Sequence, residues 1–424
     1  MPNNWKTYKL GEIAEVQNGY AFKAAELVGS GTPVIKIKNI ISPNVSIEDV
    51  SYFNGNVTAQ LEKYIAKQGD FLISMTGSTV NVMSSAVGKM GRYRINDVSL
   101  INQRVGKIYV TKPEIVSFEY LCQFLNRYEI HYSLALNATG SANQANISPA
   151  QIKDIEIKLP PLQEQQSIAS ILSAIDDKIE NNLAINKTLE EMAMALYKHW
   201  FVDFGPFQDG EFVESELGMI PKGWEVKRLD EIAYKRVESF KFKGKEKVVF
   251  INTGDVLEGS FMHQNYMDVD DLPGQAKKAI YPEDILFSEI RPANKRYAYV
   301  DFNSEEYVVS TKFMVIRNNK LVNNKLLYRI LTRSETTSEF QIIAESRSGT
   351  FPQITFDVIG HIQFALPKID IQNKFQSIVG NWEEQYSNNL KENKSLTQLR
   401  DTLLPKLISG EVRLKEFQEQ FATN

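Results

Sequence analysis

Two stretches of the chain, residues 161–204 and 369–408, carry apolar side chains at alternating spacings of four and three residues. Residues 162–203 contain neither glycine nor proline. This heptad pattern predicts two long helices that pack along a coiled-coil seam, the first about 60 Å long at ~1.5 Å per residue. The seam positions are Ile168, Leu172, Ile175, Ile179, Asn182, Asn186, Leu189, Ala193, Leu196 and Trp200, and then Phe375, Val379, Trp382, Tyr386, Asn389, Asn393, Leu396, Arg400, Leu403 and Leu407.

Each seam contains two asparagines at equivalent places. If the helices run antiparallel, Asn182 faces Asn393 and Asn186 faces Asn389, and these buried pairs would penalise any slipped register. The alternative is that the four asparagines are polar residues tolerated in the seam. The same register predicts the contacts Ile168–Leu407, Ile179–Leu396, Leu189–Tyr386 and Trp200–Phe375.

The residues before each long helix show a different pattern. Short runs rich in β-branched and aromatic residues, bounded by turn signals, predict strands at residues 33–38, 70–75, 106–110 and 307–316. On the first of these, Lys36 and Lys38 are expected to share one strand face. Helical stretches are predicted at Phe118–Asn126 and Lys325–Leu331.

The chain repeats itself once. Trp5 aligns with Trp224 at an offset of 219 residues, and Ile147 aligns with Ile354 at an offset of 207. The offset falls steadily between these points and then holds for about forty residues, as expected when the second copy of a duplication has lost loop residues. A repeat of about 200 residues is too long for a solenoid unit, so each copy should have its own core.

The predicted fold class is therefore α+β, with two similar domains separated by two long antiparallel coiled-coil helices and related by an internal pseudo-twofold duplication. The expected boundaries are residues 1–160 for the first domain, 161–204 for the first spacer helix, 205–368 for the second domain, 369–408 for the second spacer helix and 409–424 for a tail.

Composition excludes several classes of protein. The single cysteine, Cys122, cannot build a disulfide framework or a cysteine metal cluster, and the four histidines form no metal-spaced pair. We find no signal peptide and no apolar run long enough to span a bilayer, so a cytoplasmic protein is expected. The net charge of -4 excludes a uniformly basic protein, but nucleic-acid binding depends on local clusters.

Several such clusters are candidate contacts with nucleic acid, because Lys and Arg bind phosphates while Arg, Asn and Gln can bond base edges. In the first copy they are Lys36, Lys38, Thr76, Ser78, Asn102, Gln103, Arg104, Ser141, Asn143 and Gln144. In the second copy they are Lys241, Lys243, Lys245, Arg291, Lys295, Arg296, Arg347, Ser348, Thr350 and Gln353, with Lys235, Arg236, Phe240 and Phe242 interleaved in the first cluster. The alternative for each cluster is an ordinary solvated surface.

The loop at residues 140–146 leads into Ser148 and Pro149, which suit the N-cap and the first position of a helix. Its small polar residues would let a phosphate approach closely, whereas the alternative is an ordinary capped turn. No catalytic residue is expected: the sequence has no phosphate-binding glycine loop, no nucleophile elbow and no zinc-protease motif. The tetrapeptide of amino-methyltransferases is also absent, since Leu159–Leu162 reads LPPL.

Several segments together resemble the specificity (S) subunit of Type I restriction-modification systems, over essentially the whole chain. They are Trp5–Val16 with Trp224–Ala233, residues 140–165 (GSANQANISPAQIKDIEIKLPPLQEQ), Leu217–Trp224 (LGMIPKGW), Val249–Asp255 (VFINTGD) and Leu403–Val412 (LLPKLISGEV). The second copy departs from the family pattern at Pro367–Ile369, where Pro-Pro-Leu is usual.

The resemblance implies two target-recognition domains, each reading one half of a bipartite site in double-stranded DNA. It implies that the long helices act as a ruler and dock two modification (methyltransferase) subunits, which restriction (translocase/endonuclease) subunits then join. S-adenosylmethionine, ATP and Mg²⁺ would be bound by those partners, with no cofactor, no metal and no membrane contact on this chain. Two alternatives stay open: a coiled-coil scaffold that binds only proteins, and a specificity subunit of a related Type IIB/IIG-like methyltransferase-nuclease.

Overall fold

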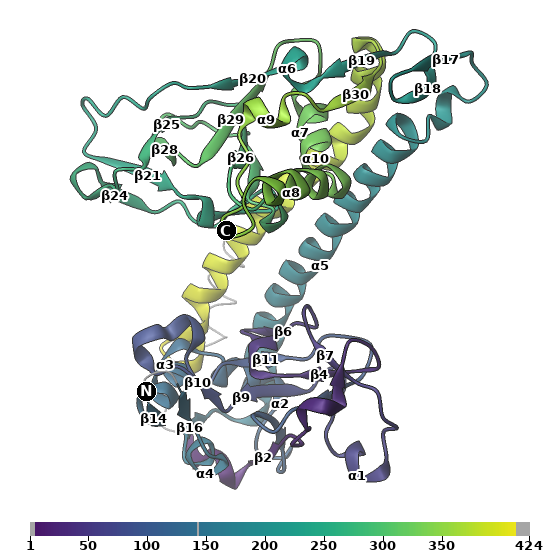
Figure 1. Cartoon of the computed structure of the whole chain (residues 1–424). Coiled ribbons are helices and arrows are strands. Elements are labelled where there is room, and N and C mark those ends of the chain that lie inside the picture. The colour runs from purple at the N-terminus through teal and green to yellow at the C-terminus, as the bar shows by residue number, and fades with distance from the viewer. Residues whose placement is uncertain (1–4, 142–143, 413–424) are drawn as a thin grey trace. The chain divides into compact units, whose positions relative to one another are not determined.

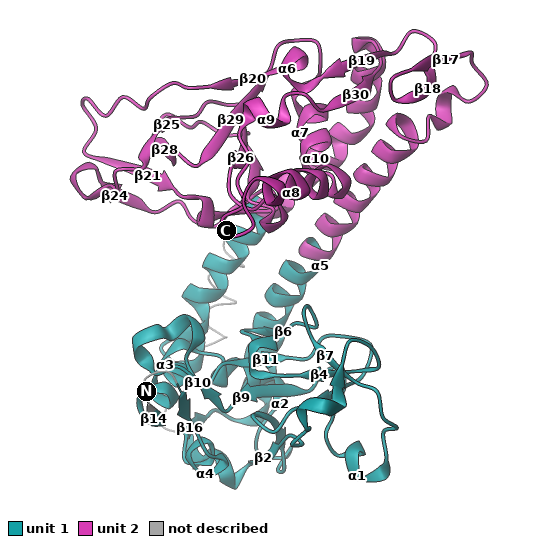
Figure 2. Cartoon of the chain, viewed as in Figure 1, with its two compact units in different colours: residues 1–182, 391–424 teal, residues 183–390 magenta. Residues whose placement is uncertain are grey.

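The computed structural model describes residues 5–141 and 144–412, which form two compact units (Figure 1). Unit 1 comprises residues 1–182 and 391–424, and unit 2 comprises residues 183–390 (Figure 2). Two long helices, α5 (Leu162–Phe201) and α10 (Ile369–Ser409), each contribute one segment to each unit. The two long helices predicted from the heptad pattern are thereby confirmed.

Unit 1 contains two main sheets. The larger has the order β2 (Ala14–Asn18), β13 (Val105–Val110), β9 (Phe71–Ser74), β11 (Met90–Arg92), β6 (Asn44–Val45) and β5 (Ile40–Ile41). The second has the order β3 (Leu27–Val28), β7 (Ser51–Phe53), β4 (Thr32–Ile35), β12 (Ser99–Ile101) and β8 (Ile65–Ala66). Smaller sheets pair β1 (Lys6–Lys9) with β16 (Glu156–Leu159), and β10 (Thr76–Gly77) with β15 (Gln144–Asn146) and β14 (Thr139–Ser141). Its shorter helices are α1 (Ala59–Glu62), α2 (Phe118–Leu125), α3 (Tyr128–Leu136) and α4 (Pro149–Lys153).

Unit 2 also contains two main sheets. One has the order β20 (Ala233–Arg236), β29 (Phe313–Asn318), β26 (Ile285–Ser288) and β27 (Tyr297–Tyr299). The other has the order β24 (Tyr266–Asp268), β21 (Lys247–Ile251), β28 (Tyr307–Ser310) and β25 (Ala276–Ala279). Three strand pairs complete it: β17 (Phe212–Ser215) with β18 (Gly218–Pro221), β19 (Glu225–Arg228) with β30 (Gln363–Leu366), and β22 (Val256–Leu257) with β23 (Ser260–Phe261). Its shorter helices are α6 (Leu229–Ile232), α7 (Asn324–Thr332), α8 (Ser334–Arg347) and α9 (Phe356–Ile359).

The two units share one topology. The order β2-β13-β9-β11 in unit 1 matches β20-β29-β26-β27 in unit 2, and β7-β4-β12-β8 matches β24-β21-β28-β25. In both units the central pair of the second sheet is parallel, β4 with β12 and β21 with β28. A shared strand order with the same parallel pair confirms the predicted duplication and the α+β class.

Each core is completed by seam residues of the long helices. In unit 1, Ile168 of α5 and Leu407 of α10 lie in the cluster that contains the fully buried Tyr120. In unit 2, Phe375 of α10 is fully buried, and its ring centroid lies 4.9 Å from that of Phe201 of α5. The apolar seam therefore packs against the domain cores as well as against the partner helix.

The asparagine pairs have the predicted partners. In unit 1 the Asn182 Nδ2 donates to Asn393 Oδ1 over 2.9 Å, and in unit 2 the Asn389 Nδ2 donates to Asn186 Oδ1 over 2.8 Å. Unit 2 also has the expected contact between Trp200 and Phe375, whose ring centroids are 5.9 Å apart. Within each unit, higher numbers on α5 meet lower numbers on α10, so the paired segments run antiparallel.

Two predicted strands have the wrong bounds. The strand expected at residues 33–38 ends at Ile35, and a 3-10 helix follows at Ile37–Asn39, because the Asn39 Oδ1 accepts the backbone N–H of Lys36 over 3.0 Å. Lys36 and Lys38 therefore do not share a strand face. The strand expected at 307–316 is broken after Ser310, whose hydroxyl accepts the N–H of Lys312 over 3.2 Å. In both cases a local side-chain acceptor replaces a strand partner.

We expect Asn186→Leu to lower the free energy of unfolding by about 1–3 kcal/mol, because it leaves the Asn389 amide facing an apolar side chain. The double variant Asn186→Leu/Asn389→Leu should recover most of that loss. Urea unfolding of Asn186→Leu, Asn389→Leu and the double variant measures the coupling between the two amides. Equal losses that simply add in the double variant would show that the pair contributes no register energy.

Candidate nucleic-acid interface

Three segments that are distant in sequence meet in unit 1 beside the end of β9. We call residues 75–78, 102–104 and 144–147 the unit 1 loop surface. The N–H of Met75 donates to the carbonyl of Arg104 over 2.8 Å, and the N–H of Ile147 donates to the carbonyl of Met75 over 3.1 Å. The Thr76 hydroxyl adds a bond of 2.7 Å to Asn146 Oδ1. Backbone bonds thus tie the three segments together.

Unit 2 builds the same surface from equivalent segments. We call residues 289–296, 311–312 and 347–354 the unit 2 loop surface. The N–H of Glu289 donates to the carbonyl of Lys312 over 2.9 Å, and the N–H of Ile354 donates to the carbonyl of Glu289 over 2.8 Å. The N–H of Arg291 donates to the carbonyl of Pro352 over 3.1 Å. Arg104 and Lys312 therefore occupy equivalent places in the two units.

Most of the candidate residues of unit 1 lie on its loop surface. They are Thr76, Ser78, Asn102, Gln103, Arg104 and Gln144. Gln103, Arg104 and Gln144 are exposed, as an interface requires. Ser141 pairs with Gln144 through the backbone of β14 and β15, and Asn143 lies outside the described residues.

The two lysines that follow β4 already have partners within unit 1. The N–H of Asn102 donates to the carbonyl of Ile35 over 2.9 Å, which places Lys36 next to the loop surface. The Lys36 ammonium, however, donates to the hydroxyl of Ser51 over 2.8 Å, and the Lys38 ammonium lies 2.5 Å from a carboxylate oxygen of Asp49. Exposed ion pairs of this kind contribute little and exchange readily for a phosphate.

The unit 2 loop surface holds all seven candidates of its region, which are Arg291, Lys295, Arg296, Arg347, Ser348, Thr350 and Gln353. Arg291 and Lys295 have φ values of 44° and 53°, a conformation that costs a non-glycine residue energy and recurs at functional loops. The Lys295 ammonium lies 2.5 Å from a carboxylate oxygen of Glu258. The Arg296 Nη1 donates to the carbonyls of Gly254 and Val256, over 3.2 and 2.9 Å, so this guanidinium supports a neighbouring turn.

The lysines of the first cluster of the second copy lie on a separate loop of unit 2. The exposed Lys241 and Lys243 belong to the loop before β21, in which the rings of Phe240 and Phe242 pack on a core of unit 2. Three other lysines of unit 2, Lys235, Lys278 and Lys312, lie within electrostatic range of one another, and we call them the basic strip. Burial lowers the pKa of Lys278, and the nearby cations Lys235 and Lys312 lower it further, while Glu289 opposes them. Three lysines therefore lie near one another here, and Glu289 partly compensates their charge.

Lys278 and Lys312 were missed by the sequence analysis. The Lys278 ammonium donates to the carbonyl of Thr311 over 2.8 Å, so it supports the turn that carries Lys312. Lys312 could have been found through the repeat, because its equivalent in the first copy, Arg104, was already a candidate. The strand predicted through residues 311–312 concealed the turn.

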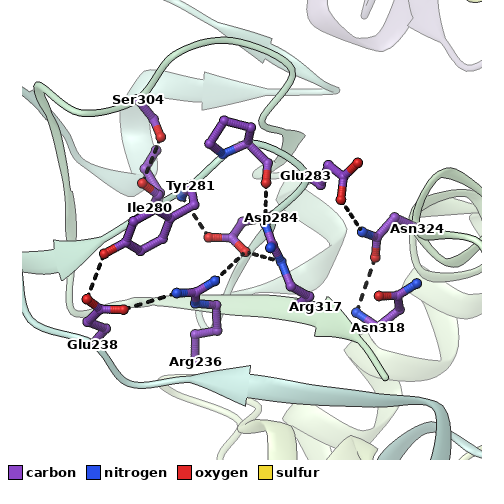
Figure 3. Close-up of polar contacts among 11 residues, drawn as sticks. Arg236, Glu238, Ile280, Tyr281, Glu283, Asp284, Ser304, Arg317, Asn318 and Asn324 are labelled. Atoms are coloured by element: carbon purple, nitrogen blue, oxygen red, sulfur yellow. Dashed lines mark hydrogen bonds and ion pairs between the residues drawn. The ribbon is translucent and has the colours of Figure 1, made fainter. Parts of the chain in front are cut away.

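Arg236, expected in the basic cluster, has an internal role instead. Figure 3 shows its guanidinium between Asp284 and Glu238, at 3.8 and 3.0 Å. The Asp284 side chain is fully buried, and Arg317 approaches it to 2.9 Å. Burial raises the pKa of the Asp284 carboxyl, an effect that the N–H of Tyr281 and the two guanidinium groups oppose. Arg236 and Arg317 thus balance a buried charge.

Within the described residues, no group of three or more His, Cys, Asp or Glu side chains is arranged to hold a metal ion. No helix of the described chain combines the length and apolarity needed to cross a bilayer.

The model of one family matches both copies of the repeat. This family is described as the Type I restriction modification DNA specificity domain, and the match covers residues 2–191 and 221–398. The chain belongs to this family. Units 1 and 2 each contain most of one specificity domain, together with the loop surface of that unit.

Individual relatives agree with the family. The HindI specificity subunit of Haemophilus influenzae is 46% identical over 181 residues, which are 42% of this chain and 39% of that protein. The MjaIX specificity subunit of Methanocaldococcus jannaschii is 28% identical over 98% of this chain and 95% of that protein. The crystal structure of a Type I S subunit from M. genitalium covers 96% of this chain with a TM-score of 0.57 and 16% identity, which supports the fold alone.

We expect Lys312→Ala in the second specificity domain to weaken binding to all duplexes by a similar factor. If its ammonium neutralises one phosphate, the slope of log K against log salt should fall by about 0.9. The matched control is Lys222→Ala, which removes an exposed lysine of the same unit that pairs with Glu211. A salt slope that is equal in both variants and the parent would exclude Lys312 from the interface.

Proposed function

We propose that the chain is the non-catalytic specificity subunit of a Type I restriction-modification complex, in which each unit reads one half of a bipartite site in double-stranded DNA. The observation that carries the proposal is the loop surface, which occurs twice on the same topology and is tied by the same backbone bonds. A duplicated reader suits a site with two separate halves. The relatives are named specificity subunits, which agrees with this role.

The side chains of the loop surfaces have the chemistry that base recognition requires. Gln103 and Arg104 are exposed on the turn between β12 and β13 in unit 1, and Arg347 is exposed at the last residue of α8 in unit 2. Arg pairs with the acceptors of guanine, and Gln or Asn pairs with adenine, through two bonds each in the major groove. The basic strip would bind phosphates, which sets the position of unit 2 on the duplex and adds affinity for any sequence.

The long helices would set the distance between the half-sites. Asparagine pairs in both units oppose slippage of α5 against α10, so the length between the recognition domains would be fixed. The proposal also assigns to these helices the docking of two modification subunits, to which restriction subunits are added. S-adenosylmethionine, ATP and Mg²⁺ then belong to the partner subunits, which supply the adenine methylation and the cleavage.

Two other functions are less well supported. A scaffold that binds only proteins has no use for two matched surfaces of exposed Arg, Gln and Lys side chains. A Type IIB/IIG-like assembly would use a similar specificity subunit, but the HindI and MjaIX relatives carry Type I names. Both alternatives would leave the geometry of the loop surfaces unchanged, so they are separated by the partners that copurify.

Exchanging residues 1–160 for the same segment of a relative should change one half of the methylated sequence and leave the other half and the spacer unchanged. The reason is that the loop surface of unit 1 lies wholly within this segment. Methylome sequencing of cells with the modification partner reads both halves at once. The reciprocal exchange of residues 205–368 is the matched control. Changes in both halves from one exchange would contradict the assignment of one reader to each half.

Inserting one heptad into each long helix, after Ala184 in α5 and after Leu390 in α10, should lengthen the spacer by about three base pairs. Seven residues add about 10 Å of helix, and base pairs rise ~3.4 Å each. The insertion leaves the asparagine pairs within each unit intact. An insertion into α5 alone is the control, because it shifts the seam out of register and should abolish methylation. An unchanged spacer in the double insertion would refute the ruler.

A further inference from the structure

One buried glutamine stands at the start of each long helix. Gln165, the fourth residue of α5, has no exposed surface although it lies in a polar sequence. Its Oε1 accepts the N–H of Ser117 over 2.9 Å, and its Nε2 donates to the carbonyls of Ile115 and Pro160, each over 2.9 Å. Both donor hydrogens and the acceptor of the amide are therefore satisfied by backbone. This side chain joins the loop before α2 to the entry of α5.

Unit 2 repeats this arrangement bond for bond. Gln372 is the fourth residue of α10 and is also fully buried. Its Oε1 accepts the N–H of Asn323 over 2.9 Å, and its Nε2 donates to the carbonyls of Leu321 and Pro367 over 3.2 and 2.9 Å. The same contacts persist although the sequence around Pro367 departs from the first copy. We call the three backbone bonds of Gln165, or of Gln372, the clamp. The clamp is repeated in the two units, whereas the residues next to it differ.

A second contact lies about three helical turns along each long helix. In unit 1 the Gln123 Nε2 of α2 donates to an Asp176 oxygen over 2.8 Å. In unit 2 the Arg329 Nη2 of α7 donates to a Glu383 oxygen over 2.7 Å. Each short helix is thus held to its long helix at two separate places, the clamp and this second contact. These two contacts fix the direction of α2 along α5 and of α7 along α10.

These short helices lead directly to the loop surfaces. In unit 1 the chain passes from α2 through α3 into β14 and β15, and the latter strand belongs to the loop surface. In unit 2 it passes from α7 through α8 to the segment 347–354. A rotation at the clamp would therefore be carried to the DNA-reading side chains, because α2 and α7 are packed in the domain cores.

We propose that Gln165 and Gln372 are positioning residues, each of which fixes the orientation of one recognition domain on its long helix and thereby the accepted distance between the half-sites. The inference rests on the proposed function. It goes beyond that function because neither side chain contacts the ligand: both are buried and bound only to backbone. Three backbone bonds from one amide are directional, whereas an apolar side chain in the same place would only fill volume.

The test uses Gln165→Met and Gln372→Met, which keep the side-chain length and remove every hydrogen bond. The full chain with its modification partner is measured against duplexes that carry the site mapped for the parent complex, with the parent spacer or one base pair more or fewer. We expect the preference for the parent spacer to fall by about tenfold in each variant, the value of one or two lost bonds, with the half-site sequences unchanged. The matched controls Gln166→Met and Asn373→Met alter exposed neighbours and should keep the parent preference.

The outcomes distinguish a failure of the proposed function from a failure of the positioning role of the glutamines. If the parent complex shows no sequence preference, the proposed function fails. If the parent is selective and the variants lose affinity equally at all spacers, with a lower melting temperature, the glutamines serve stability alone and the inference is overturned. An unchanged spacer preference overturns it as well.

A distance measurement covers the case in which the variants bind too weakly. Spin labels at Glu129→Cys on α3 and Ala174→Cys on α5 report the orientation within unit 1. Cys122 will not compete for the label, because it is buried and burial raises the pKa of its thiol to about 12. Gln165→Met should broaden the distance distribution and Gln166→Met should not. Equal distributions in both variants would contradict a positioning role.

Discussion

Buried side-chain amides are the constraint on which this architecture depends. Burying an amide away from water raises the free energy of the folded state unless its donors and acceptor find partners in one specific geometry. Asn182 and Asn186 find them on the opposite long helix, and Gln165 and Gln372 find them on the backbone of the adjoining domain. Apolar seam residues would tolerate neighbouring registers that the asparagine pairs reject, while the two glutamines hold each domain on its own long helix.

The sequence contained enough information for the scaffold. Helix period and asparagine placement on the seam predicted both long helices and the partners of Asn182 and Asn186, because a repeating pattern over many residues averages out local exceptions. The falling offset between Trp5/Trp224 and Ile147/Ile354 predicted the duplication that the shared strand order confirmed. The N-cap of α4 was also correct, since Ser148 accepts the N–H of Gln151 over 3.3 Å. These features are local in sequence or repeat along it.

The loop surfaces were harder to predict because they depend on contacts between distant segments. Nothing near Arg236 in the sequence reveals that Asp284 is buried beside it, and so its charge was misassigned. Lys312 was hidden by a strand-like run that one serine hydroxyl interrupts. Helices α3 and α8 were not predicted, because their apolar residues form no sustained stripe that a period would detect. The sequence identified many of the residues on the loop surfaces. Only the tertiary structure showed which segments meet to form them.

Charge and geometry together explain why orientation should matter for this protein. The chain has a net charge of -4, so at long range it does not attract a polyanion. In the proposed function, favourable contacts would arise only where Lys312 and other exposed lysines come within about a Debye length, ~8–10 Å, of a phosphate. With attraction limited to this range, a recognition domain that is turned away from its half-site would contribute little binding free energy. If Gln165 and Gln372 hold each domain rigidly on its long helix, both domains would contact DNA only when the half-sites lie at the right distance. The complex would then discriminate between sites by the length of the spacer.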